Sequence, residues 1–275
     1  LDRSQIPGDI LVWHDILYDG TRKPGWPDAE TLRARSKFIE QATGGGLGRD
    51  VVLRTLEEQY RRLERMGADE SIVLWFDACL FDQAMLAHLL ACLRVKNITN
   101  VELLCVDAFP GIHRYNGLGQ LEPAQMVSVY DQRRPVTAEQ FQFAERVDRA
   151  FALQDKAALA ELAGCADAPL RWVPAAAQRW LAEVPDPATG LGRLEQLALE
   201  AIRAGRKAPA VIFEYVAAKD TPPLFWGDTT LWAKINGLAD RRPPLVRIEG
   251  PNPRLPQWDG LADLKQFRVY PWKKK

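Results

Sequence analysis

Two apolar runs on either side of an Ala- and Leu-rich segment constrain the fold of this chain more than any other feature. Residues 71–76 (Ser-Ile-Val-Leu-Trp-Phe) and 100–106 (Asn-Val-Glu-Leu-Leu-Cys-Val) have the length of strands, and residues 82–93 have that of a helix. Strands that are apolar on both faces are typical of parallel sheets with both sides covered. The order strand, helix, strand therefore predicts an α/β fold, with an N-terminal, mostly parallel sheet and helices on both faces.

The N-terminal part adds one strand and two helices to this prediction. Residues 9–13 (Asp-Ile-Leu-Val-Trp) predict a further buried strand. A helix is expected over residues 29–41, behind the N-cap candidate Asp28, and another over residues 50–66. Together these elements define an α/β domain over residues 1–130.

The pattern becomes helical after residue 130. Residues 133–136 indicate a linker, and Thr137 with Gln140 forms a capping box that opens a helix over 138–152. Five more helices are expected at 156–163, 174–183, 193–204, 210–218 and 229–239, followed by two strands at 245–248 and 267–270. We therefore expect a helical linker region over residues 131–190 and a winged-helix-like domain over residues 191–275.

The composition excludes several classes of protein. The 275 residues carry 36 Lys and Arg against 36 Asp and Glu, so no overall basic field attracts nucleic acid. No run of about 18 apolar residues predicts a membrane span, and the N-terminus lacks the pattern of a secretory signal. The four cysteines and three histidines show no zinc-ligand spacing, and the cysteines are most simply interpreted as reduced. We expect a cytoplasmic protein with no membrane partner.

Acidic residues follow the three predicted strands. Asp15, Asp77 and Asp107 stand at these strand ends, and Asp82 opens the helix after the second strand. Ligands of open parallel sheets bind beyond the carboxyl ends of the strands, where carboxylates bind cations or transfer protons. His14 is a further candidate, as a general base or a metal ligand. The alternative is that each acid caps the turn or helix that follows it.

The segment after the third strand is a candidate ligand-binding loop. It is rich in glycine and polar residues, and Arg114 has the geometry to bind a phosphate or carboxylate. The alternative is a turn that only carries the chain across the sheet edge. The candidate ligand-binding residues are Arg114, Tyr115, Asn116, Gly117 and Gly119.

The C-terminal part is locally basic. Residues 222–275 carry ten Lys or Arg and five Asp or Glu, a net charge of +5, which is a footprint for phosphates. In a nucleic-acid-binding protein the contacts would come from Lys234, Arg241, Arg242 and Arg247. Most residues of the helix predicted over 229–239 are core-like, so a winged helix used for packing is favoured over one that binds DNA.

Several motifs resemble those of one bacterial family. Residues 13–20 (Trp-His-Asp-Ile-Leu-Tyr-Asp-Gly) and 74–83 (Leu-Trp-Phe-Asp-Ala-Cys-Leu-Phe-Asp-Gln) are similar to two motifs of the family called domain of unknown function 1835. Residues 109–121 are similar to a third motif, with Phe-Pro-Gly at their start and Gly-Leu-Gly-Gln-Leu at their end. Residues 134–137, and Gly227-Asp228 with Trp232, also fit, so the resemblance covers nearly the whole chain.

The resemblance ranks the candidates without assigning an activity. It places Asp15, Asp82 and Asp107 first because they match the family motifs, and then Asp77, which replaces one acid by another. The chain departs from the motifs at residues 78–79 and 108. Family members begin with a strand and a Thr-Asn-Gly-Asp-Ser-like turn. The chain has no such segment and starts at Leu1, so we expect the α/β domain to lack a first strand.

Three functions remain open at this point. The first is binding of a small anionic or nucleotide-like ligand by the α/β domain, with hydrolase or transferase activity. The second is nucleic-acid binding or regulation through the C-terminal unit. The third is a non-catalytic scaffold, which a joined exposed patch of tryptophans would favour. The sequence leaves the cofactor, the metal and the oligomeric state open.

Overall fold

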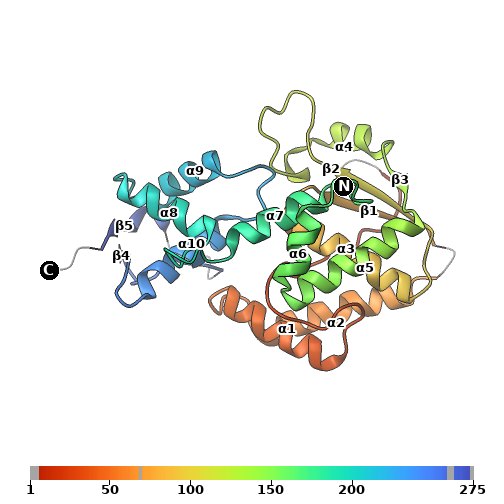
Figure 1. Ribbon diagram of the computed structural model, residues 1–275, viewed down its shortest axis with the longest axis horizontal. Coiled ribbons are helices and arrows are strands. Elements are labelled where there is room, and N and C mark those ends of the chain that lie inside the picture. Colours follow the sequence, from red (N-terminus) through yellow and green to blue (C-terminus); the bar gives the residue numbers. More distant parts are fainter. Residues whose placement is uncertain (1–5, 68–69, 259–262, 273–275) are drawn as a thin grey trace.

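The fold is mixed α/β, with helices dominating (Figure 1). The computed structural model describes residues 6–67, 70–258 and 263–272. Among these residues it has ten α-helices, one three-stranded sheet and one two-stranded sheet.

The predicted parallel pair is present. Strands β1 (Ile72–Asp77) and β2 (Val101–Val106) pair in parallel over their full length, with Ile72 opposite Val101 and Asp77 opposite Val106. Helix α3 (Leu80–Val95) makes the crossover between them. The third strand, β3 (Arg134–Pro135), pairs antiparallel with β2. The sheet is therefore smaller than predicted, and only one of its two pairings is parallel.

Both faces of this sheet are covered, because alternate residues of each strand point to opposite sides. Leu74, Phe76 and Leu103 join the main core, to which α3 belongs. Leu104 and Val106 belong to a second cluster on the other face. There, α4 (Pro123–Tyr130) contributes Val129, and its last residue, Tyr130, stacks on Trp75 with the ring centroids 5.8 Å apart.

The prediction of a strand over residues 9–13 is wrong. This segment has no regular secondary structure, and Ile10 and Val12 are 39% and 59% exposed. It runs beside α2 (Arg49–Arg65). The amide of His14 donates to Gln59 of α2 at 2.7 Å, and the Gln59 side-chain amide donates back to the His14 carbonyl at 3.3 Å. A side chain, and not a neighbouring strand, thus satisfies the backbone at this point.

The predicted helices of the first half are confirmed. Helix α1 (Ala29–Ala42) begins where Asp28 accepts a hydrogen bond from the Thr31 amide at 2.8 Å. Helix α5 (Ala138–Leu153) begins at the capping box of Thr137 and Gln140. The prediction of a linker over residues 133–136 is corrected, since Arg134–Pro135 forms β3. Helix α4 was not predicted, and a short 3-10 helix precedes it at Leu118–Gln120.

The second half follows the predicted order of helices and strands. Helices α6 (Lys156–Ala163) and α7 (Val173–Glu183) lead to a unit to the left in Figure 1. That unit holds three helices, two antiparallel strands and a 3-10 helix: α8 (Arg193–Arg203), α9 (Pro209–Lys219), α10 (Asp228–Asp240), β4 (Val246–Glu249), Leu264–Gln266 and β5 (Arg268–Pro271).

A buried polar cluster ties the N-terminal segment to α2, α3 and α5. Asp148 accepts from Arg22 at 2.6 Å and lies 3.0 Å from His88, whose other ring nitrogen lies 2.6 Å from the Tyr60 hydroxyl. Burial alone would lower the pKa of His88, but Cys92 and Asp148 beside it raise that pKa to about 9. The structure thus shows His88 bonded within a buried charged cluster.

No helix within the described ranges is both long enough and apolar enough to cross a bilayer.

Candidate functional site

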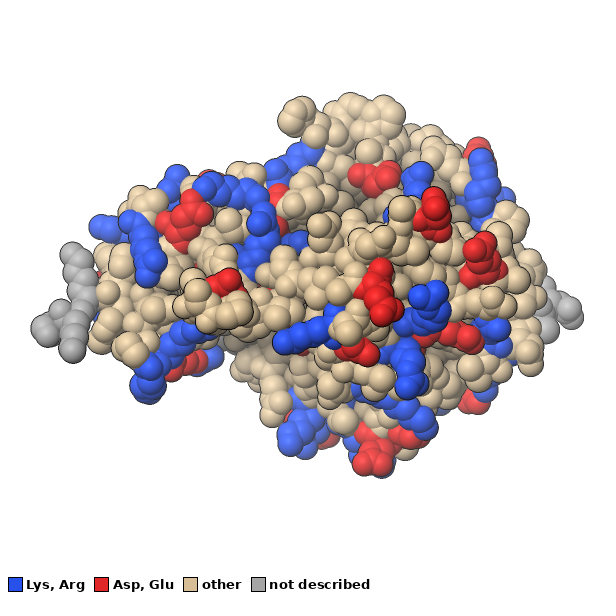
Figure 2. All heavy atoms as spheres, in the orientation of Figure 1, with Lys and Arg blue, Asp and Glu red and all other residues tan. Residues whose placement is uncertain are grey.

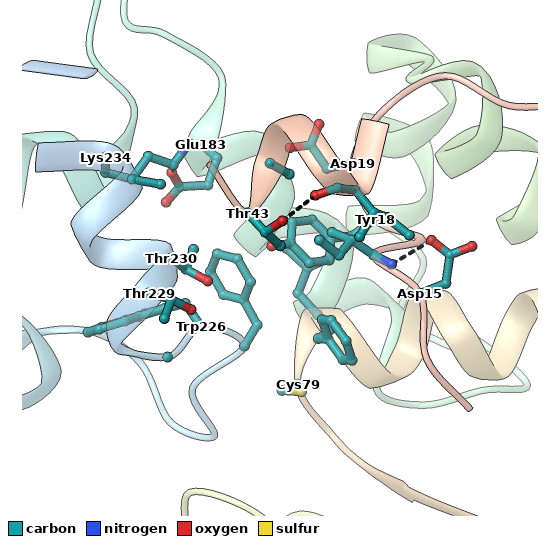
Figure 3. A pocket seen from close by; sticks show the side chains of 18 of the residues that line it. Asp15, Tyr18, Asp19, Thr43, Cys79, Glu183, Trp226, Thr229, Thr230 and Lys234 are labelled. Carbon is teal, nitrogen blue, oxygen red and sulfur yellow. Dashed lines mark hydrogen bonds and ion pairs between the residues drawn. The ribbon is translucent and has the colours of Figure 1, made fainter. Parts of the chain in front are cut away.

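A cleft of about 1380 Å³ lies between the first half of the chain and the C-terminal unit. We call it the central cleft. Six segments are the main contributors to its walls: the N-terminal segment, helix α1, helix α2, the start of α3, the end of α7, and α10. In Figure 3, Glu183, Thr229 and Lys234 lie on one side and Tyr18 and Asp19 on the other. Clefts of this kind, partly apolar and with a few polar groups, are the usual binding sites for small molecules.

Helix α10 forms one wall because it is amphipathic. The residues that line the cleft recur every three or four positions, which places them on one side of the helix: Thr230, Ala233, Lys234 and Gly237. The other side packs into the core through buried apolar side chains: Leu231, Ile235 and Leu238. The helix therefore faces the cleft with its small and polar residues.

The turn between β1 and α3 brings two carboxyl groups to the opposite wall. The Asp82 carboxylate accepts a hydrogen bond from the Asp77 main-chain amide at 2.5 Å. Burial, with a smaller contribution from the charge of Asp77, raises the pKa of Asp82 to about 7. Burial also raises the pKa of Asp77, although hydrogen bonds from Tyr115 and Leu118 oppose the shift. Asp82 is thus a carboxyl group that exchanges its proton near neutral pH.

Asp77 holds the loop that was expected to bind a ligand. It accepts from the Tyr115 hydroxyl at 2.6 Å and from the Leu118 amide at 2.9 Å. Gly117 between them has φ = +142°, and a Cβ there would lie 2.7 Å from the Asp77 carboxylate, so only glycine fits. Tyr115 and Gly117 therefore serve to fasten the loop to the end of β1.

The rest of this loop also lies outside the cleft lining. The Arg114 guanidinium donates to main-chain carbonyls at the end of α9: those of Ala217, Ala218 and Asp220. The Asn116 amide donates to Gln120 within the loop at 2.5 Å, and Gly119 has open space around it. None of the five loop candidates lines the central cleft. The Arg114 guanidinium, which was expected to bind an anion, is instead bonded to main-chain carbonyls.

Of the remaining candidates, Asp15 and His14 line the cleft and Asp107 does not. Asp15 lines the cleft, but its buried carboxylate is paired with Arg35 at 2.6 Å. His14 lines the cleft with an exposed side chain. Asp107 is exposed outside the lining and accepts from the Trp172 indole at 2.9 Å. Asp15, Asp77 and Asp82 therefore line the same cleft, and Asp107 lies outside it.

The lining of the cleft is acidic. Its basic side chains are His14, Lys156 and Lys234, and Lys234 lies 4.0 Å from Glu183. The acidic ones outnumber them: Asp15, Asp19, Asp77, Asp82, Glu183, Glu195 and Asp228. Nowhere in the described part of the chain do three His, Cys, Asp or Glu side chains come together as metal ligands.

The residues considered for nucleic acid do not form one basic surface. Lys234 lines the cleft, Arg241 donates to the Gly190 carbonyl at 2.6 Å, and Arg247 is paired with Glu249. Arg242 donates to main-chain carbonyls beside it in the chain. On the face seen in Figure 2, acidic and basic side chains are interspersed.

The chain matches no protein-family model, no curated protein and no solved structure. The resemblance to the family called domain of unknown function 1835 therefore stays a prediction.

Sequence reasoning missed the residues that α7 and α10 bring to the cleft. Glu183, Trp226, Thr229 and Thr230 line it, together with Tyr18 from the N-terminal segment. The Gly-Asp-Thr start of α10 is visible in the sequence, but nothing in the sequence places that helix opposite α3.

Four tryptophans of the second half, Trp172, Trp180, Trp226 and Trp258, do not form the joined exposed patch that a scaffold would favour. Trp180 and Trp226 are buried, Trp172 is half-buried, and Trp258 is exposed.

Proposed function

We propose that the chain binds a small molecule in the central cleft and that Asp82 exchanges a proton with it, in chemistry of the hydrolase or transferase type. The observation that carries this proposal is a carboxyl group with a pKa of about 7 on the wall of a large cleft. A general acid or base works best when its pKa is close to the working pH. Strongly shifted groups in clefts also mark functional sites more often than other positions do.

The lining favours a neutral or cationic ligand with an apolar body over an anionic or nucleotide-like one. Apolar side chains of α1 and α2, including Ile39, Val52 and Leu56, face the cleft. An anion would meet more carboxyl groups than basic side chains, although Asp15, Glu183 and Glu195 are already paired with arginines, and the guanidinium of Arg114 binds the end of α9. Desolvating an anion among like charges is unfavourable.

Binding of Nile red, a neutral apolar dye, tests the proposal. Ala233→Trp fills the cleft from α10 and is expected to weaken dye binding by about tenfold or more. Ala210→Trp places the same side chain on the exposed side of α9, outside the lining, and should bind the dye like the wild type. Equal affinity of both variants for the dye would contradict the proposal.

We propose separately that residues 191–275 are a winged-helix-like unit used for packing. The order α8, α9, α10, β4, β5 supports this assignment. The third helix faces the central cleft and the core, and two of the basic residues nearby are already bonded within the protein. A packing role follows more directly from these contacts than a role in binding DNA.

A cytoplasmic location is also part of the proposal. All four cysteines are free, as expected for a protein of a reducing compartment.

A further inference from the structure

At one edge of the central cleft, two residues of the C-terminal unit touch the loop between α1 and α2. The Gln257 side-chain amide donates to the Ala42 carbonyl at 3.1 Å. Trp258 packs so closely on Gly46 that a Cβ there would lie 2.4 Å from the Trp258 Cβ. We call this contact, between residues 257–258 and 42–46, the clasp.

The clasp is a small contact on the surface. Trp258 lines the cleft but is 53% exposed, and the one hydrogen bond of the clasp joins neutral groups. Gly44, Gly45 and Gly46 carry no side chains, so this part of the loop contributes only backbone to the contact. A neutral, partly exposed hydrogen bond adds little net stability.

The other contacts between the two halves are more deeply buried. The indole of Trp180, a buried residue, donates to the Tyr18 carbonyl at 2.9 Å, and the Tyr18 ring packs edge-on against Phe225 at 5.2 Å. The Arg114 guanidinium joins the loop after β2 to the last carbonyls of α9. The two halves are thus fastened by buried aromatic side chains and the half-buried Arg114, as well as by the clasp.

We propose that the clasp is the edge at which the central cleft opens, so that Gln257 and Trp258 control access to it. This proposal rests on the proposed function, because the molecule that would enter through the clasp is the ligand of the central cleft. The opening itself is an equilibrium of the free protein and can be measured without any ligand. Breaking the clasp should expose the cleft walls and leave the core intact.

Two glycines of the same loop provide a matched pair of variants. Gly46 is not among the positive-φ residues, so alanine fits the backbone there, but its Cβ would collide with the Trp258 main chain. Gly48 has φ = −66°, and a Cβ there meets nothing within 4 Å. Gly46→Ala should therefore open the clasp, and Gly48→Ala should leave it closed.

The measurement is the rate at which N-ethylmaleimide labels Cys79, followed by mass spectrometry on the full chain. Cys79 lies on the cleft wall and is buried, whereas Cys92 is fully buried outside the lining and reports global unfolding. We expect Cys79 to be labelled several-fold faster in Gly46→Ala than in the wild type or Gly48→Ala, with no change at Cys92. Trp258→Ala removes the same contact without adding an atom and should give the same increase.

Equal Cys79 labelling in all four proteins would overturn the proposal. An increase at Cys79 that is matched at Cys92 would also overturn it, because the variant would then be unfolding as a whole. If Cys79 labelling rises as expected but Nile red does not bind in the cleft, the clasp stands and the proposed function fails.

Discussion

Asp82 is the residue whose environment departs furthest from what its position in the sequence suggests. An acid in the first turn of a helix usually has a pKa at or below its ordinary value of about 4, because the helix dipole favours the charge. Burial and the neighbouring Asp77 outweigh that effect and raise the pKa of Asp82 from 3.8 to about 7. The folded state therefore binds this proton more tightly than the unfolded chain. The resulting stabilisation is complete below about pH 4 and is lost as the pH rises through 7.

Asp82→Asn should therefore stabilise the protein at high pH. At pH 8 we expect the free energy of unfolding to rise by about 4 kcal/mol, because the buried charge is removed while an oxygen remains to accept from the Asp77 amide. At pH 4 the variant and the wild type should be alike, as measured by urea unfolding. Asp131→Asn changes a largely exposed acid and should have little effect at either pH. A difference between Asp82→Asn and the wild type that does not change with pH would refute this assignment.

At this scale the sequence predicts which acids stand at strand ends but not what each of them contacts. Asp77 and Asp82 were found because a strand and a helix meet there. Asp15 was found by the same rule, although its segment is not a strand and its carboxylate is paired with Arg35, 20 residues away. Pairings of this kind depend on how helices pack, and the sequence pattern does not contain that information.

Among the elements, the loop after β2 is held in place by the end of β1. Removing the Tyr115 hydroxyl with Tyr115→Phe leaves Asp77 with fewer donors, and we expect a loss of about 1–2 kcal/mol in the free energy of unfolding. Hydrogen exchange should quicken at the Leu118 amide, which donates to Asp77, and at Gln120 beside it. The control is Tyr130→Phe, which keeps the stack on Trp75 and should leave the exchange of this loop unchanged. Unchanged exchange in both variants would show that Asp77 does not hold the loop.

Most elements could be predicted because their signals are local. The capping box at Thr137, the N-cap Asp28 and the apolar run of β1 each act within a few residues. The segments that were predicted wrongly are short, or their structure depends on which elements lie beside them. The two residues of β3 exist only because β2 lies beside them, and residues 9–13 resemble a strand but find no strand to pair with.

For the whole molecule, the decisive feature is the cleft, and the sequence pattern does not predict it. Its walls come from α3 and α10, which are separated by about half of the chain, and from α1 and α2. The sequence does show that α10 is apolar on one side, but it does not show that the other side lines the same cleft as Asp82. The function proposed here therefore depends on an arrangement that only the three-dimensional structure reveals.

Soaking crystals with three fragments of similar size tests that arrangement most directly: benzylammonium, benzyl alcohol and benzoate. We predict density for the cationic or the neutral fragment between α10 and the start of α3, with its polar atom within hydrogen-bond distance of the Asp82 carboxyl group, and none there for benzoate. A cleft that stays empty with all three fragments, or that takes up benzoate alone, would contradict the account.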